Sequence, residues 1–338
     1  MTLRDVILHV NFLFNYPIYS MIWSLSAYLL LMYFGGPVVR GILLGYTAYI
    51  FLDPTPSQGG WSDSNRIRYW ARSTFSFKLM REYFDTELVR TAELDCNRAY
   101  MFIYHPHGII GIGCNTTLTT EACDFSINFP GISRSTCTLN ASFLVPFYRE
   151  WMLANGIISA NKKTIINHLC SGNSLVLVPG GAAEALHAHP GVFRLFLRQR
   201  KGFIRIAIQT GCSIVPCLGF GENEIFHTLY DKNLTSDHGE RTGFLKAIFY
   251  FQTWLKGFLS FSFPIATHVF PKREKIVVVT GAPIHFDTVL DSVKCDDVGA
   301  ANDEIVDKYH ALYCASVQKL YDQNKRKYGV DGVELMIL

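Results

Sequence analysis

The sequence of 338 residues predicts an α/β protein in which an N-terminal membrane hairpin precedes a mixed, largely parallel sheet flanked by helices. Three observations predict this fold class. The first is a long uncharged apolar segment near the N-terminus, and the second is an alternation of short apolar runs with helix-like stretches beyond it. The third is a set of His- and Gly-containing motifs directly after strand-like runs, because ligands collect at the carboxyl ends of strands in such sheets.

The N-terminal segment carries no Lys, Arg, Asp or Glu from Val6 to Val39. This run exceeds the roughly 20 apolar residues of a membrane-spanning helix, and it lacks the basic start and cleavage site of a signal peptide. A shorter apolar stretch follows from Gly41 to Leu52. Two arrangements fit: a hairpin that turns at Gly35-Gly36-Pro37, or one span followed by a re-entrant or interfacial segment. Residues 1–53 therefore form the expected membrane region, and residues 54–338 form the expected domain outside it.

The flanking charges predict on which side of the membrane the domain lies. Only Arg4 precedes the apolar region, whereas several basic residues follow it: Arg66, Arg68, Arg72, Lys78 and Arg81. By the positive-inside tendency, the domain faces the cytosol. A second candidate for contact with the membrane interface is the Phe-rich segment 244–270, in which Lys246 and Lys256 are spaced to snorkel. A buried core helix is the alternative interpretation of that segment.

Composition agrees with a membrane-associated protein. Apolar residues make up 49% of the chain, and charged residues only 17%, below the usual quarter of soluble domains. The formal net charge of +3 is too small and too diffuse for nucleic-acid binding.

The domain beyond the membrane region shows the alternation that favours an α/β sheet with parallel pairs. We expect strands at 99–104, 175–178, 213–218 and 275–280, and helices at 146–155, 163–169, 202–210 and 303–327. Three polar segments fall just after these strands, at His107, at Gly180-Gly181 and at 219–224. They are expected to converge on one crevice.

The first chemical motif is Tyr104-His105-Pro106-His107-Gly108, at the end of the first expected strand. A histidine titrates near pH ~6.5, so one placed there can take a proton from an alcohol at neutral pH. Two other interpretations stay open, namely a satisfied core histidine and half of a metal site. The chain has no Cys-x-x-Cys and no His-Glu-x-x-His, and we therefore predict no metal.

The second motif, Val178-Pro179-Gly180-Gly181-Ala182-Ala183-Glu184, is a strand that leads through two glycines into a helix. Backbone N–H groups exposed at Gly180 and Gly181 suit a phosphate, a carboxylate or a developing oxyanion. Glu184 would lie in the first turn of that helix. It either orients the imidazole of His107 and stabilises its cationic form, or simply complements the helix dipole.

Two further segments are candidates for substrate binding. Phe220-Gly221-Glu222-Asn223-Glu224 places two carboxylates and an amide after another strand, where Glu222 or Asn223 could bind a hydroxyl. The densest basic cluster contains Arg194, Arg198, Arg200, Lys201 and Arg205. It is either a solvated helix face or the attachment point of a phosphate-bearing substrate.

Together these motifs resemble the type-2 diacylglycerol acyltransferase family, which includes monoacylglycerol and wax-ester acyltransferases. The resemblance covers nearly the whole chain beyond the membrane segment. It rests on the two motifs and the Phe220–Glu224 segment above, on Arg200-Lys201-Gly202-Phe203, and on Phe129-Pro130-Gly131 and Arg149-Glu150 in the same order. It implies a glycerolipid-acyltransferase-like fold and transfer of a fatty acyl group from acyl-CoA to diacylglycerol, giving triacylglycerol. It also implies an endoplasmic reticulum enzyme, body facing the cytosol, that can reach lipid droplets.

The resemblance implies roles for particular residues. His107 would be the general base, with His105 positioning it or serving in its place, and Glu184 would be the orienting carboxylate, with Glu222 as the second choice. Related glycerolipid acyltransferases use a His-x4-Asp pattern, but positions 110 and 112 are both Ile here. Gly108, Gly180 and Gly181 would border the oxyanion. Arg200 and Lys201 would hold the phosphates of coenzyme A.

The expected partners are acyl-CoA as co-substrate, diacylglycerol or a related acceptor, and the membrane. A thioester is an activated donor, so no further cofactor is predicted. Monoacylglycerol and fatty alcohols stay open as acceptors, and a homo-oligomer stays open as the assembly state. Two alternatives to this mechanism remain: an acyl-enzyme on Cys114, and a non-catalytic lipid-droplet hairpin protein.

Overall fold

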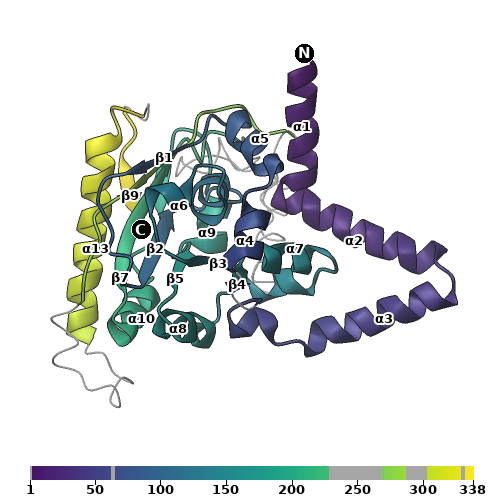
Figure 1. Cartoon of the computed structure of the whole chain (residues 1–338). Coiled ribbons are helices and arrows are strands. Elements are labelled where there is room, and N and C mark those ends of the chain that lie inside the picture. The colour runs from purple at the N-terminus through teal and green to yellow at the C-terminus, as the bar shows by residue number, and fades with distance from the viewer. Residues whose placement is uncertain (1, 62–64, 228–267, 269, 287–302, 329–331) are drawn as a thin grey trace, which may run out of the picture. The chain divides into compact units, whose positions relative to one another are not determined.

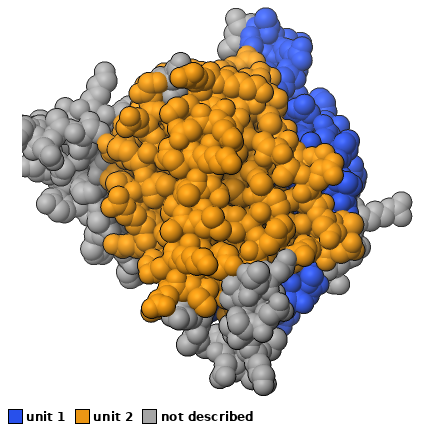
Figure 2. Space-filling model, turned by 90° about the vertical axis from the view of Figure 1, so that its left-hand side faces the viewer, with its two compact units in different colours: residues 1–83, 116–177 blue, residues 84–115, 178–338 orange. Residues whose placement is uncertain are grey.

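The computed structural model of the protein describes residues 2–61, 65–227, 268, 270–286, 303–328 and 332–338. It divides into two compact units, and each unit is assembled from two separate stretches of chain (Figure 2). Unit 1 comprises residues 1–83 and 116–177, and unit 2 comprises residues 84–115 and 178–338. All the predicted site residues belong to unit 2.

Unit 1 contains the N-terminal helices and a three-stranded parallel sheet. Its helices are α1 (Leu3–Asn15), α2 (Pro17–Phe34), α3 (Pro37–Leu52), α4 (Asn65–Arg72), α5 (Phe75–Tyr83), α6 (Phe125–Asn128), α7 (Tyr148–Ala154) and α8 (Lys162–Cys170), with 3-10 turns at Thr55–Gln58 and Asn140–Leu144. Its strands β5 (Ser174–Leu177), β3 (Arg134–Thr138) and β4 (Ile157–Ser159) lie side by side in that order, with β3 parallel to both neighbours. A π-helix, Cys114–Thr119, spans the sequence boundary between the units.

The apolar N-terminal run forms three helices rather than one long helix (Figure 1). Pro17 has no N–H for a helical hydrogen bond and restricts the preceding residue to extended backbone, so α1 ends before it and α2 starts at it. Helix α2 ends and helix α3 begins at Gly35-Gly36-Pro37, and the hydroxyl groups of Tyr28 and Thr47 lie 2.5 Å apart between them.

Among the described helices, none is by itself both long and apolar enough for a membrane span. One pair passes the criterion jointly: Leu3–Asn15 with Ile18–Phe34, which meet at a bend of 65°. The membrane location of the hairpin therefore stays a prediction.

In the part of unit 2 that the structure describes, there are four strands of mixed direction and a separate strand pair. Strands β1 (Glu87–Arg90), β8 (Val277–Thr280), β7 (Ser213–Phe220) and β2 (Tyr100–His105) lie in that order. The β1–β8 and β2–β7 pairs are parallel, and the β7–β8 pair is antiparallel. Strand β6 (Phe193–Leu195) pairs with β9 (Leu335–Ile337), and the described helices of the unit are α9 (Gly181–Leu186), α10 (Gly202–Thr210) and α13 (Asp303–Asn324).

The core of unit 2 explains why its central strands were visible in the sequence. Every residue of β2, β7 and β8 is buried, so these strands appear as the continuous apolar runs that are typical of sheets covered on both faces. Helix α13 runs beside β7 and packs against α10 (Figure 1). The predicted mixed, largely parallel sheet with flanking helices is confirmed. The segment 244–270 lies almost entirely outside the described residues.

Replacing Ile214 by Ala in β7 should destabilise the protein strongly. Ile214 is fully buried opposite Met101 of β2, and truncation of such a side chain costs roughly 2–5 kcal/mol because a cavity remains. Denaturant unfolding of the detergent-solubilised protein measures this loss. Leu312→Ala on α13 is the control, because Leu312 is 49% exposed and its truncation should cost less than about 1 kcal/mol. Equal losses in the two variants would contradict the placement of β7 in the core.

Candidate active site

The site begins where strand β2 ends. Tyr100 to His105 are all buried, and the chain then passes through a cis His105–Pro106 peptide bond to His107, which is partly exposed. The two histidines of the motif therefore differ in their surroundings. His105 is part of the core of unit 2, whereas the side chain of His107 is partly open to solvent.

The imidazole of His107 has the protonation pattern of a general base. Its Nδ1 lies 3.1 Å from the carbonyl oxygen of Gly108, and a carbonyl can only accept a hydrogen bond, so Nδ1 carries the proton. The lone pair is consequently on Nε2, which has no hydrogen-bond partner among the described residues. Loss of solvation lowers the pKa of His107, although the Gly108 carbonyl and the Glu184 charge oppose that shift. The ring is therefore neutral at neutral pH.

The imidazole of His105 is held on both sides. Its Nε2 lies 3.0 Å from the hydroxyl of Tyr313 on α13, and its Nδ1 lies 3.6 Å from Oε1 of Glu184. The side chain of His105 is 0% exposed. This histidine is fixed within the protein and presents no ring nitrogen to solvent.

Glu184 contacts both histidines of the motif, but it meets the backbone of His107 and not its ring. Its Oε2 accepts the backbone N–H of His107 at 2.9 Å, and its Oε1 accepts the N–H of Phe196 at 3.1 Å. In the described structure the carboxylate faces the ring of His105, and the predicted contact with the ring of His107 is absent. The reason is that the ring of His107 turns to the carbonyl of Gly108 instead.

The ionisation of Glu184 follows from these contacts. Burial raises the pKa of its carboxyl, but His105 and the N–H groups of His107 and Phe196 outweigh burial and hold the pKa below its usual value. Gly180, immediately before α9, makes room for this carboxylate, because a Cβ at position 180 would lie 1.8 Å from the Glu184 carboxyl carbon. Gly181 is the first residue of α9. Whether Gly180 and Gly181 donate to an oxyanion stays a prediction.

Glu222 shapes the loop after the histidines. Its carboxylate accepts hydrogen bonds from the N–H groups of Ile112 and Gly113, at 2.8 and 2.7 Å, and from the hydroxyl of Tyr104 at 2.7 Å. Gly108 has a positive φ of 57°, and a Cβ there would lie 2.6 Å from Cγ of Glu222. Burial raises the pKa of Glu222 to about 7, and the three hydrogen bonds only partly offset that shift.

The rest of the Phe220–Glu224 segment also binds the protein's own backbone. The amide nitrogen of Asn223 donates to the carbonyl of Val192 at 2.8 Å, and Glu224 accepts the N–H of Gly191 at the same distance. These contacts tie the segment to the loop before β6. Substrate binding by Glu222 or Asn223 stays a prediction, and the observed contacts are those of positioning residues.

The basic cluster borders a cavity in unit 2. Arg198, Lys201 and His310 are among the residues that line it, and its volume is about 460 Å³. Lys201 pairs with Asp307 at 2.5 Å and Arg205 with Asp303 at 2.5 Å, both as half-exposed ion pairs that solvent screens. Arg200 is exposed and is not among the lining residues. The cluster is thus divided between a cavity and the open surface.

Sequence reasoning missed the two tyrosines of the site. The strand pattern could have identified Tyr104, because it precedes His105 in β2 and is fully buried. Tyr313 is separated from His105 by 208 positions and occurs in an ordinary amphipathic helix, so no local signal marks it. Cys114, the alternative nucleophile, is buried at the start of the π-helix. The described residues contain no group of three or more His, Cys, Asp or Glu side chains arranged to hold a metal ion.

Comparison with known proteins gives this geometry its chemical context. Residues 31–338 match the family model described as diacylglycerol acyltransferase, and the match covers every site residue above. The protein is therefore an acyltransferase, a class whose reaction a base such as His107 serves. Within that class, the chain belongs to the diacylglycerol acyltransferase family.

Individual relatives differ in the acceptor that their names state. The chain is 36% identical to the diacylglycerol O-acyltransferase 2A of Umbelopsis ramanniana, over 87% of this chain and 79% of that protein. It is 34% identical to the human acyl-CoA wax alcohol acyltransferase 1, with coverages of 94% and 88%. It is 31% identical to the human 2-acylglycerol O-acyltransferase 1, with coverages of 88% and 85%.

Among solved structures, the 1-acyl-sn-glycerophosphate acyltransferase of Thermotoga maritima aligns with 83% of this chain and 97% of that one, at 12% identity and a TM-score of 0.37. A score of that size supports no inference about this chain.

The variant Glu222→Gln should change the pH dependence of stability. The folded-state pKa of about 7 exceeds the ordinary value of 4.5, so folding favours the protonated acid. This stabilising contribution is fully present below about pH 4.5 and is lost as the pH rises through about 7. An amide does not titrate, so the variant should lose less unfolding free energy than the wild type between those two pH values.

The measurement is denaturant unfolding of both proteins at a series of pH values. His107 titrates in both proteins, and its lowered pKa acts in the opposite direction, so only the difference between the two curves reports on Glu222. Parallel curves across the whole range would show that Glu222 keeps an ordinary pKa.

Proposed function

We propose that this protein transfers a fatty acyl group from acyl-CoA to the free hydroxyl of diacylglycerol and so forms triacylglycerol. The observation that carries the mechanism is the hydrogen bond from Nδ1 of His107 to the carbonyl of Gly108, because it leaves Nε2 unprotonated. Family membership supports the reaction class. The name of the relative from Umbelopsis ramanniana supports diacylglycerol as the acceptor.

In the proposed reaction, the acceptor hydroxyl attacks the thioester carbonyl while Nε2 of His107 removes its proton. The tetrahedral intermediate then expels the thiolate of coenzyme A, which takes up the proton that His107 holds, and the ester remains. The thioester supplies the driving force for the transfer. Backbone N–H groups near Gly108 or Gly180-Gly181 would stabilise the oxyanion of the intermediate.

Glu184, His105 and Tyr313 serve this reaction as positioning residues. Glu184 accepts the backbone N–H of His107 and so fixes the point from which the imidazole projects. Tyr313 fixes the ring of His105, which in turn lies against Glu184. The proton transfer itself is assigned to His107, since the nitrogens of the His105 ring face Tyr313 and Glu184.

The protein would act at the endoplasmic reticulum membrane, with unit 2 in contact with the cytosol and access to lipid droplets. Large apolar side chains on α2 and α3 support a membrane location, because Phe34, Val38 and Leu52 are 76%, 75% and 81% exposed. A diacylglycerol dissolves in the bilayer, so its acyltransferase must reach that phase.

Replacing His107 by Ala should abolish acyl transfer while expression and membrane association are retained. The reason is that no other ring nitrogen of the motif is available to accept the hydroxyl proton. Membranes that contain the wild type or the variant are supplied with labelled acyl-CoA and, in separate reactions, with diacylglycerol, monoacylglycerol or a fatty alcohol. We expect labelled triacylglycerol from the wild type with diacylglycerol alone.

Each other outcome of that assay has a definite meaning. Variant activity within about tenfold of wild type would reject His107 as the base. A labelled product from another acceptor would change the substrate and keep the mechanism. No ester with any of the three acceptors would contradict the proposed transfer to diacylglycerol.

Replacing Arg198 and Lys201 together by Ala should raise KM for acyl-CoA about tenfold and change kcat little, because each solvent-screened charged contact contributes roughly 0.2–1 kcal/mol and the two losses add. Both residues line the cavity of unit 2. An acyl-pantetheine donor, which lacks the nucleotide phosphates, should react equally well with both proteins. Lys325→Ala is the control, since Lys325 pairs with Asp322 on the surface. An unchanged KM for acyl-CoA would place its phosphates elsewhere.

A further inference from the structure

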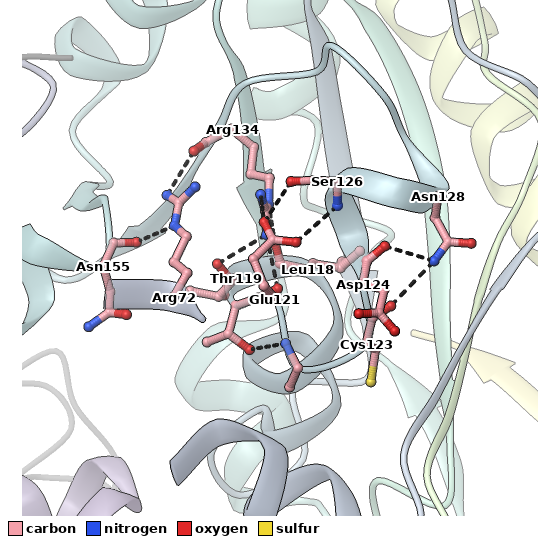
Figure 3. A network of polar contacts seen from close by, with 12 residues as sticks. Arg72, Leu118, Thr119, Glu121, Cys123, Asp124, Ser126, Asn128, Arg134 and Asn155 are labelled. Carbon is pink, nitrogen blue, oxygen red and sulfur yellow. Dashed lines mark hydrogen bonds and ion pairs between the residues drawn. The ribbon is translucent and has the colours of Figure 1, made fainter. Parts of the chain in front are cut away.

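Unit 1 contains a cavity of about 210 Å³ that the proposed reaction does not use. It lies between helix α4, helix α6 and the start of strand β3, and Figure 3 shows the polar network beside it. Its charged lining consists of Arg68, Arg72, Arg134 and Glu121. All four side chains are buried, with exposures of 6%, 5%, 3% and 6%. Three cations and one carboxylate therefore face one small space.

Arg134 is neutralised and fully engaged. Its Nη1 pairs with Oε1 of Glu121 at 2.8 Å, and Nε and Nη2 donate to the carbonyls of Leu118 and Thr120 at 2.7 and 2.9 Å (Figure 3). The guanidinium carbon also lies 3.8 Å from the centre of the Phe125 ring. The single carboxylate among the described lining residues is thus already bound to one arginine.

Arg72 has hydrogen-bond partners but forms no salt bridge with any residue that the structure describes. Its Nε donates to the carbonyl of Asn155 at 2.8 Å, and its Nη2 donates to the carbonyl of Arg134 at 2.9 Å (Figure 3). A carbonyl satisfies a hydrogen bond without cancelling a charge. Burial lowers the pKa of Arg72 well below its usual value, the charges of Arg134 and Arg68 lower it further, and the charge of Glu121 only partly opposes them. A second anion in the cavity would offset this cost.

The shape of the cavity restricts the anion. Arg68 and Arg72 are four residues apart and project from the same face of α4, and guanidinium groups bind phosphate oxygens through paired hydrogen bonds. A volume of about 210 Å³ accommodates a phosphate with a short substituent but excludes a fatty acyl chain. The matching ligand is therefore a small, doubly charged group.

The surroundings of the cavity favour a phosphate carried by a lipid. On α4, Ile67, Tyr69 and Trp70 are 56%, 56% and 72% exposed, and on α6, Ile127 is 79% exposed next to the lining residue Ser126. Tyr and Trp side chains gather at the level of lipid headgroups. Tyr69 is both exposed and a lining residue, so an aromatic side chain borders the basic cavity, and this arrangement matches a lipid whose headgroup is a phosphate.

We propose that the cavity bordered by Arg68, Arg72 and Arg134 binds a phosphate monoester group, with an anionic phospholipid at the membrane surface as its source. The site lies wholly in unit 1 and is separate from the residues assigned to acyl transfer. Binding there does not depend on the acceptor or on the role of His107.

The test measures binding to the full-length protein in detergent micelles. Three probes are compared by microscale thermophoresis: phosphatidic acid, phosphatidylcholine and inorganic phosphate. We expect phosphatidic acid to bind at least tenfold more tightly than phosphatidylcholine. Arg72→Gln should weaken the binding of phosphatidic acid at least tenfold. Arg81→Gln is the matched control, because Arg81 is a half-exposed arginine of the same unit that pairs with Asp124, and it should change binding less than twofold.

The outcomes separate the sources of the phosphate. Phosphatidic acid binding that inorganic phosphate does not displace at millimolar concentration supports the lipid source. If inorganic phosphate binds as tightly as phosphatidic acid, and Arg72→Gln loses that binding, the same site takes a soluble ligand. Equal binding of the two lipids, or equal losses in Arg72→Gln and Arg81→Gln, would overturn the proposal.

A second variant covers the case in which Arg72→Gln does not fold, as shown by its thermal unfolding. Arg72→Lys keeps the charge but loses the planar pair of donors, so it should retain weakened binding of phosphatidic acid. Binding by Arg72→Lys that equals the wild type, or that does not discriminate phosphatidic acid from phosphatidylcholine, would equally overturn the site. Acyl transfer is measured in parallel, so a failure of the proposed function would be recognised separately.

Discussion

The arrangement of the site depends on one buried carboxylate. Glu184 is almost completely removed from solvent, and an ionised carboxylate in that position must have partners for both oxygens. It finds them in the N–H groups of His107 and Phe196 and in the ring of His105. Each contact restricts a different segment of unit 2. The loop after β2, the segment after β6 and helix α9 are therefore held together by a single charge.

Glu222 is equally buried, but the pKa of its carboxyl is shifted in the opposite direction. Glu184 faces a histidine ring that can carry a positive charge, and its pKa lies below the usual value. Glu222 receives only neutral donors, from Tyr104, Ile112 and Gly113, and these do not cancel the cost of burying a charge. Two carboxylates that accept hydrogen bonds from the same histidine loop thus prefer different protonation states. The difference follows from one neighbouring ring, because both side chains are well hydrogen-bonded.

The sequence predicts the parts of this structure that local patterns determine. Strands β2, β7 and β8 are fully buried, so each is a visible apolar run, and helix α10 has the predicted bounds Gly202–Thr210. Strand β3, Arg134–Thr138, was not expected, because its polar residues face partners supplied by distant loops. The sequence identifies the motif residues as candidates, but it does not show which of their atoms are in contact. The partner of the His105 ring lies on α13, and the ring of His107 binds the carbonyl of its neighbour Gly108. The spacing of residues in the sequence indicates neither contact.

The interleaving of the two units determines the order in which the site can be completed during translation. Unit 1 has all its strands once residue 177 has left the ribosome, whereas unit 2 needs chain from both sides of that stretch. His107 is made early, but Glu184, Glu222 and Tyr313 follow only after it, the last by about 200 residues. Contacts between residues so far apart in sequence cannot form until most of the polypeptide has been synthesised. The contact between His105 and Tyr313 therefore cannot form until α13 has emerged from the ribosome.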